Sequence, residues 1–319
     1  MCRSRIGAPE DALGKGLNAH VISNESFQEW FQRRRLAKPF LRWAGGKQPF
    51  LAKYGRKLPR FHGKYIEPFL GSGAVFFYIQ RTQARPTDAL LGDSNLQLIL
   101  TYYAVRDEPE RVFAELDGIR EAYLAAEDRR AFYEDLRAGY NNGLPAVEPA
   151  VFIFLNRTCW NGLYRTNREG NFNVPHGMFK GDPAFPALPD LLNASASLRQ
   201  AQLRASSWEN VASSATKEDF VFLDPPYYSD VIASDSKYGR EVFGLEQHKK
   251  LVRLLLDLQR RDVQFMLTNS AEEDLVRMYL DNGLYVEHTR VPRSINSDTE
   301  KRVSVSEIIV SGKPPLRLA

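Results

Sequence analysis

The chain has 319 residues, of which 43% are hydrophobic and 26% are charged, and these proportions are typical of a folded globular protein. No apolar run approaches the ~18 residues that a membrane span needs, and residues 1–18 lack the apolar stretch of a secretory signal, so we expect a cytoplasmic protein with no membrane partner. The two cysteines, Cys2 and Cys159, are too few for a disulfide framework. No metal is expected, because the five histidines show no metal-ligand spacing (His20, His62, His176, His248 and His288).

The net charge of +4 is unevenly distributed along the chain. Between Trp30 and Ile66 there are eleven basic residues and no acidic residue: Arg33, Arg34, Arg35, Lys38, Arg42, Lys47, Lys53, Arg56, Lys57, Arg60 and Lys64. Such a one-signed density predicts a surface that binds a polyanion. The alternative is an ordinary solvated basic face.

The first half of the chain begins with an N-terminal extension, residues 1–37, which contains a short helix capped by Ser23 or Asn24 and reaching Arg35. The pattern then predicts a strand over 64–69, a tight turn over 69–73, a helix over 74–84, a strand over 89–93 and a helix over 95–105. This βαβα run is typical of a parallel sheet that is covered by helices.

The segment from about Phe113 to Gln200 breaks that rhythm with charged helical stretches and a polar, aromatic region, so we expect an insertion outside the sheet. The rhythm then resumes with strands over 219–224 and 263–269, helices over 245–261 and 272–281, and closing strands over 284–291 and 303–310 that form an antiparallel pair. The sequence therefore predicts an α/β fold with a mostly parallel sheet and an antiparallel edge. Its core is residues 38–112 and 202–319, and residues 113–201 form a mainly helical insertion with a β-hairpin.

The first candidate site motif is EPFLGSG, residues 67–73, where Gly71 and Gly73 allow a positive φ and the close approach of a ligand. Asp93 ends the next strand, where a carboxylate can accept hydrogen bonds from ribose hydroxyls. The third glycine of the dinucleotide pattern is missing, and Glu67 favours a cationic ligand such as the ammonium of S-adenosylmethionine over a pyrophosphate. The alternative is a plain turn.

The second motif is Asp224-Pro225-Pro226-Tyr227, which follows the apolar strand and so lies at its carboxyl end, where ligands bind in open α/β sheets. An adenine amino group can donate to the Asp224 carboxylate and to the Pro225 carbonyl while Tyr227 stacks on the ring. The N6 lone pair is then free to attack a sulfonium methyl group. The alternative is a loop that simply stops the strand, with Asp224 as a helix cap.

Two further stretches combine basic and aromatic residues. FLRWAGGK, residues 40–47, places Trp43 and Lys47 on either side of a Gly-Gly turn. The stretch 156–178 surrounds Asn161-Gly162, a hairpin-type turn dipeptide, and its side chains could contact phosphates, read base edges and wedge into a base stack. The alternative is a polar surface hairpin that Trp160 anchors to the core.

FLRWAGGK, EPFLGSGAVFF, NRTCWNGLYR with FNVP, and DPPY occur in that order over roughly residues 38–310, and together they resemble the Dam-type (D12, α-group) DNA adenine-N6 methyltransferases. The resemblance implies a Rossmann-like class I methyltransferase core with a target-recognition insertion, S-adenosylmethionine as donor and duplex DNA as substrate. It also implies that one set of residues borders the donor: Trp43, Lys47, Glu67, Phe69, Gly71, Gly73, Asp93 and Asp224.

The same resemblance implies DNA contacts for Arg42 at the first base, Arg165 at a guanine and Trp160 as the wedge beside the flipped adenine. Further expected contacts are Asn161 beside the wedge, Arg157 at a phosphate, Pro175 at a base, and Arg293, Ser294 and Asn296 at phosphates near the flipped base. GATC-reading relatives usually carry Lys, a basic residue and Tyr where Arg42, Met178 and Phe179 stand, so the recognition sequence stays open between GATC and another site.

These features favour a monomeric adenine-N6 methyltransferase that acts on DNA in a bacterial or phage-infected cytoplasm, with a separately acting restriction endonuclease as a candidate partner. Asp224 serves mainly as a hydrogen-bond acceptor, with Pro225, Pro226 and Tyr227 completing the catalytic motif. Three alternatives stay open: methylation of cytosine N4, methylation of RNA or glutamine, and a catalytically silent DNA-binding regulator. A Rossmann dehydrogenase is disfavoured by the missing glycine.

Overall fold

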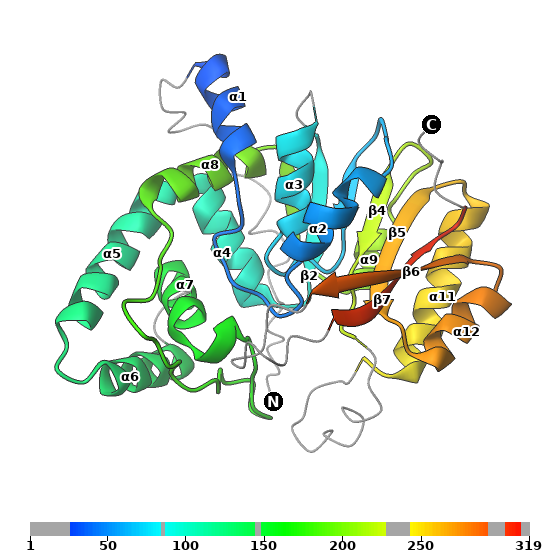
Figure 1. Cartoon of the computed structure of the whole chain (residues 1–319). Helices are drawn as coiled ribbons and strands as arrows, with labels where there is room; N and C mark the ends of the chain where they lie inside the picture. The colour runs from blue at the N-terminus through cyan, green and yellow to red at the C-terminus, as the bar shows by residue number, and fades with distance from the viewer. Residues whose placement is uncertain (1–25, 84–86, 144–147, 228–242, 293–303, 314–319) are drawn as a thin grey trace, which may run out of the picture.

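A computed structural model describes residues 26–83, 87–143, 148–227, 243–292 and 304–313 (Figure 1). Several sequence predictions fall outside these ranges and have no structural counterpart here. They concern Arg293, Ser294 and Asn296 as phosphate contacts near the flipped base.

The described residues contain a seven-stranded sheet with the order β3-β2-β1-β4-β5-β7-β6. The strands β3, β2, β1, β4 and β5 are parallel, and β7 is antiparallel to both β5 and β6. The α/β prediction, with its antiparallel edge and Rossmann-like methyltransferase order, is confirmed. The strands are β1 Tyr65–Glu67, β2 Ala89–Asp93, β3 Ala201–Ala205, β4 Phe220–Leu223, β5 Gln264–Ser270, β6 Tyr285–Pro292 and β7 Ser304–Ser311.

Helices cover both faces of this sheet, and β4 shows why, because all four of its residues are buried. Phe220 and Phe222 pack into the hydrophobic cluster on one face, and Val221 and Leu223 pack into the cluster on the other. The first face carries α2 Gln48–Tyr54, η1 Gly55–Lys57, α3 Ala74–Thr82 and α4 Leu96–Asp107. The second carries α9 Trp208–Ala212, α11 Leu245–Arg260 and α12 Glu273–Asp281.

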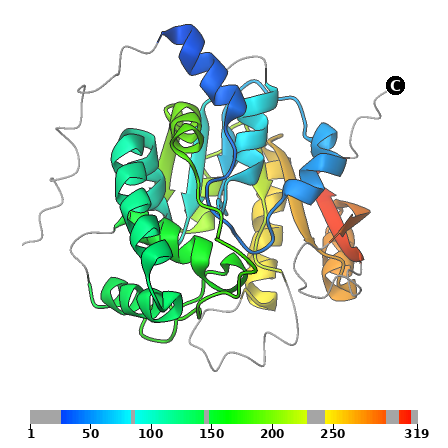
Figure 2. The ribbon, with the colours of Figure 1, turned by 60° about the vertical axis from the view of Figure 1, so that its left-hand side comes forward.

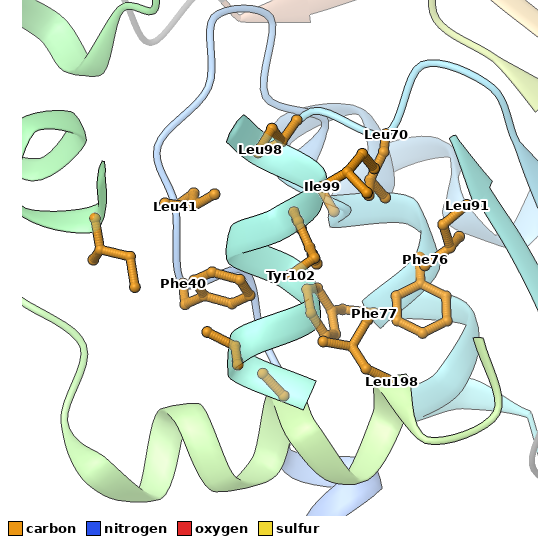
Figure 3. Close-up of a cluster of buried hydrophobic side chains, with 14 of the residues drawn as sticks. Phe40, Leu41, Leu70, Phe76, Phe77, Leu91, Leu98, Ile99, Tyr102 and Leu198 are labelled. Atoms are coloured by element: carbon orange, nitrogen blue, oxygen red, sulfur yellow. The ribbon is translucent and has the colours of Figure 1, made fainter. Parts of the chain in front are cut away.

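The first cluster joins the FLRWAGGK segment to the core. Phe40 lies 5.0 Å from Tyr102 and 6.5 Å from Phe77, measured between ring centroids, and Leu41 is 4% exposed (Figure 3). Burial of these side chains holds the start of the segment, at Phe40, against Tyr102 of α4. The polar part of that segment is therefore presented beside the loop that follows β1.

The insertion is a helical layer beside the sheet (Figure 1, left). It consists of α5 Pro109–Ala125, α6 Arg129–Asn141, α7 Pro149–Thr158, the 3₁₀ turn η2 Trp160–Gly162 and α8 Leu188–Leu198. Tyr123, Tyr133 and Phe154 form its interior and are fully buried. The mainly helical prediction for this segment agrees with the structure.

The predicted hairpin turn at Asn161-Gly162 is wrong. These residues form η2, with φ of 54° and 63°, and the antiparallel bridges join Cys159 to His176 and Thr166 to Phe172. The turn between the two arms lies instead at 167–170, where the Gly170 N–H donates to the Asn167 carbonyl at 3.1 Å. Asn161-Gly162 is used for close approach, because a Cβ on Gly162 would lie 2.5 Å from the Arg42 Cβ.

The helix α1, Phe27–Leu36, is capped by Ser26 in a capping box with Glu29, so the prediction of Ser23 or Asn24 as the cap is wrong. It packs against α8 and α3, and the Arg34 guanidinium, in a residue only 1% exposed, donates to the Gln80 carbonyl at 2.7 Å. Both ribbon views place α1 at the top of the molecule and the 159–178 hairpin at the bottom (Figures 1 and 2).

The basic stretch 30–66 therefore does not form one polyanion-binding surface. Arg34 is buried in a structural contact, and Lys47, 5% exposed, is buried in an ion pair with Asp224. Lys57 pairs with Glu287 on β6, and Lys38 pairs with Asp190 at 3.0 Å. Acids from distant elements thus pair with three of the eleven basic residues of the stretch, which a local charge count cannot detect.

Candidate active site

The loop after β1 is held in place by its neighbours. The Gly71 N–H donates to Asp93 Oδ2 at 3.1 Å, the Asn95 N–H donates to Asp93 Oδ1 at 3.0 Å, and the Tyr102 hydroxyl donates to the Gly71 carbonyl at 3.1 Å. Gly71 and Gly73 have φ of 49° and 64°, as the motif predicts. Asp93 thus holds the loop through Oδ2 and the start of the following segment through Oδ1.

Trp43 covers this loop. A Cβ on Gly71 would lie 2.7 Å from the Trp43 Cδ1, so only glycine allows the indole to lie against the backbone here. The other face of Trp43 stacks on Tyr164, with ring centroids 5.6 Å apart and an interplanar angle of 14°. The loop after β1 and the hairpin are therefore joined through one aromatic pair.

Phe69 belongs to a second aromatic group beside the loop. It stacks on Trp208 with centroids 6.0 Å apart, and it meets Phe243 edge-on at 5.8 Å. Trp208 is not among the predicted site residues. It follows the end of β3 by three residues, and an aromatic residue in such a position can indicate a site that binds a planar ring. A ligand that lies over the ends of β1 and β3 would meet these rings.

Asp224 follows β4, next to β1 at the point where the strand order reverses. Its carboxylate has two partners: Lys47 Nζ lies 2.7 Å from Oδ2, and the Thr268 hydroxyl donates to Oδ1 at 2.9 Å. Lys47 Nζ also donates to the Gly45 carbonyl at 3.0 Å and to the Tyr227 hydroxyl at 3.3 Å. Pro225 is buried and Pro226 exposed, so the motif runs outward from the sheet.

Glu67 is a buried carboxylic group, 3% exposed, at the end of β1. Burial is the main cause that raises its pKa well above the usual range, and the nearby Asp224 adds to the rise while Lys47 opposes it. Its Oε2 has no hydrogen-bond partner within the described part of the chain. Such an oxygen is suited to a cationic or N–H ligand group.

The predicted DNA contacts gather at the hairpin end of the molecule. Arg42 is exposed, and Asn156 holds its backbone on both sides: the Arg42 N–H donates to Asn156 Oδ1 at 2.8 Å, and Asn156 Nδ2 donates to the Arg42 carbonyl at 2.7 Å. Arg165 is exposed and donates through Nε to Asn173 Oδ1 at 2.9 Å. The role of the Asn156 side chain, which holds the Arg42 backbone against α7, is not among the sequence predictions.

Trp160 is half-buried, and its backbone N–H donates to the carbonyl of the exposed Pro175 at 2.9 Å. Asn161 is exposed beside it. Burial and the nearby Arg42 charge lower the pKa of Arg157 to about 10, and its Nε is buried without a partner among the described residues. These side chains could meet a polyanion together, and their individual contacts stay predictions.

Two features are absent from the described residues. No group of three or more His, Cys, Asp or Glu side chains in those ranges could hold a metal ion. No helix in the described ranges is both long and apolar enough to span a membrane.

Comparison with known proteins agrees with this geometry. The family model of the D12 class N6 adenine-specific DNA methyltransferases matches residues 43–292. The chain is 35% identical to the type II methyltransferase M.MjaIII of Methanocaldococcus jannaschii, over 83% of this chain and 95% of that protein. It is 30% identical to the DNA adenine methylase of Escherichia coli K12, over 87% of this chain and 96% of that protein. The chain therefore belongs to the D12 class N6 adenine-specific DNA methyltransferases.

Proposed function

We propose that this protein transfers the methyl group of S-adenosylmethionine to N6 of an adenine in a short duplex DNA site, after that adenine has been flipped out of the base stack. The observation that carries the proposal is the position of Asp224, which is tethered at the end of β4 directly beside the loop after β1. Flipping is required because N6 is otherwise unreachable inside the duplex.

Asp224, Pro225 and Tyr227 provide what an adenine needs. The Asp224 carboxylate and the Pro225 carbonyl accept the two N6 hydrogens, and the Tyr227 ring supports the base. Asp224 acts as a hydrogen-bond acceptor rather than as a strong base, because neutral N6 has no acidic proton to remove and the methylated product cation loses its proton easily after transfer. Proximity and alignment then account for most of the catalysis.

The donor-binding residues fit S-adenosylmethionine, which supplies an electrophilic methyl group on a sulfonium. Glu67 offers the ammonium a buried oxygen that has no hydrogen-bond partner among the described residues, and the Asp93 carboxylate at the end of β2 accepts hydrogen bonds from the ribose hydroxyls. Gly71 and Gly73 let the backbone approach the ligand, while Trp43, Lys47 and Phe69 border it. No step of this scheme requires a metal.

In this proposal residues 113–201 form the target-recognition insertion on a core of residues 38–112 and 202–319. The side chains at the hairpin end meet DNA: the exposed Arg42, Asn161, Arg165 and Pro175 and the half-buried Trp160, with Arg157 behind them. The protein works as a monomer in the cytoplasm. Relatives named type II methyltransferases support a separately acting restriction endonuclease as its partner.

The test is methyl transfer from labelled S-adenosylmethionine into unmethylated plasmid DNA, followed by sequencing that locates N6-methyladenine. Asp224→Ala should abolish turnover and spare donor binding, whereas Asp281→Ala, at an exposed carboxylate at the end of α12, should change neither. Retention of more than about a tenth of the wild-type rate by Asp224→Ala would refute the assignment. Label in cytosine, or DNA binding without transfer, would favour N4 methylation or a silent regulator.

A further inference from the structure

We infer that Thr268 is a positioning residue, whose hydroxyl sets the plane of the Asp224 carboxylate for the acceptor amine. The inference rests on the proposed function, in which Asp224 accepts a hydrogen bond from N6. Thr268 lies on β5, next to β4, and is fully buried. Its hydroxyl donates to Asp224 Oδ1 at 2.9 Å.

The two tethers of the carboxylate differ in stiffness. Lys47, on Oδ2, reaches Asp224 through a flexible four-carbon stem and shares its ammonium with Gly45 and Tyr227. Thr268 is β-branched, so its χ1 is restricted, and it lies on a strand that is hydrogen-bonded on both sides by β4 and β7. Thr268 is therefore the more rigid of the two partners that hold the Asp224 carboxylate.

An orienting partner matters because the terminal torsion of an aspartate is broad and does not fix the carboxylate plane by itself. Thr268 lies one residue past the ladder with β4, which ends at Leu267, and it pairs with Ile309 of β7, so its hydroxyl reaches Asp224 just beyond the end of β4. Oδ1 retains a second lone pair after this bond forms. Thr268 thus determines in which direction that lone pair points toward N6.

Thr268→Val keeps the shape of the side chain and removes the donor, and Thr268→Ser keeps the donor. With saturating donor and a duplex oligonucleotide, we expect Thr268→Val to lower the single-turnover rate by about 10- to 100-fold, a loss typical of a misplaced catalytic group. Donor affinity, measured by calorimetry, should stay within about threefold of wild type. The Thr268 hydroxyl donates to Asp224, and Thr268 itself is not among the residues proposed to border the donor. Thr268→Ser, which keeps the donor and loses the β-branch, should recover part of the rate.

The matched control is Thr289→Val, which removes another buried strand hydroxyl, one that donates to the Glu307 carbonyl at 3.2 Å. It should leave the rate unchanged. A Thr268→Val rate within twofold of wild type, a Thr268→Ser variant as slow as Thr268→Val, or an equal loss in Thr289→Val would overturn the inference.

A crystal structure of Thr268→Val separates this inference from the proposed function. The Asp224 carboxylate should be rotated or disordered relative to wild type, and an unchanged plane would overturn the positioning role whatever the acceptor is. A wild-type protein that methylates no adenine would instead refute the proposed function, and the crystal structure would still decide the role of Thr268.

Discussion

Gly71→Ala tests whether the contact between the loop after β1 and Trp43 is essential. The residue has φ of +49°, and an added Cβ would lie 2.7 Å from the Trp43 Cδ1. A left-handed conformation costs an alanine about 1–2 kcal/mol. Forcing a methyl group against the indole adds about 1–3 kcal/mol of overpacking. The variant should therefore lose about 2–5 kcal/mol of unfolding free energy.

Gly283→Ala is the matched control, because Gly283 has φ of +74° and an added Cβ there would meet nothing within 4 Å. It lies after α12, away from the loop, and should lose only the conformational cost of about 1–2 kcal/mol. The entropy that alanine removes from the unfolded chain is common to both variants and cancels in the comparison.

The assays are urea unfolding and calorimetric titration with S-adenosylmethionine. Displacement of the indole should weaken donor binding to Gly71→Ala at least about tenfold, which equals about 1.4 kcal/mol, and leave Gly283→Ala unaffected. If the two variants lose equal stability and both keep wild-type donor affinity, the contact between Gly71 and Trp43 has no role in forming the site.

Two further predictions concern buried groups. Because burial raises the pKa of Glu67, the unfolded chain releases this proton at a lower pH than the folded protein, so Glu67 lowers stability as the pH rises above about 4.3. Without donor, Glu67→Gln should therefore show a shallower fall of unfolding free energy from pH 5 to 8, and identical slopes would contradict the assigned shift. Arg34→Met should cost about 2–4 kcal/mol by leaving the Gln80 carbonyl without its buried donor, and the exposed Arg35→Met should cost less than about 0.5 kcal/mol. Neither arginine variant should change DNA affinity in a gel-shift titration, since α1 lies at the end of the molecule opposite the hairpin. A weakened complex would instead support one continuous DNA-binding surface over residues 30–66.

Much of the fold could be predicted from periodicity, because the central strands are apolar and the helices between them are amphipathic. The segment that forms β3 could not, because an edge strand exposes residues such as Gln202 and Arg204 and so lacks an apolar pattern. The helix cap at Ser26 was misplaced for a local reason, since three neighbouring residues have suitable side chains and only the pairing with Glu29 selects one.

At the candidate site, the motifs located Asp224 and the Gly71 loop because both follow strands that end at the same edge of the sheet. The partners of these residues come from elsewhere in the chain: Thr268 lies 44 residues from Asp224, and Asn156 lies 114 residues from Arg42. No local pattern encodes such pairs. The same limit applies to the basic stretch, in which three of the eleven charges meet Asp190, Asp224 and Glu287 only after folding.

The place where the insertion joins the sheet has a consequence for how such proteins diversify. The chain leaves the core after α4 and re-enters it at β3, the outermost strand, while Asp224 and the loop after β1 lie at the centre of the sheet. Insertions and deletions between those two junctions therefore affect the β3 edge of the sheet and leave the pairing of its central strands unchanged. Under the proposed function, in which the insertion contacts DNA, a gene can therefore acquire a different recognition segment by recombination, provided that the new segment supplies an amide in place of Asn156 and a ring in place of Tyr164.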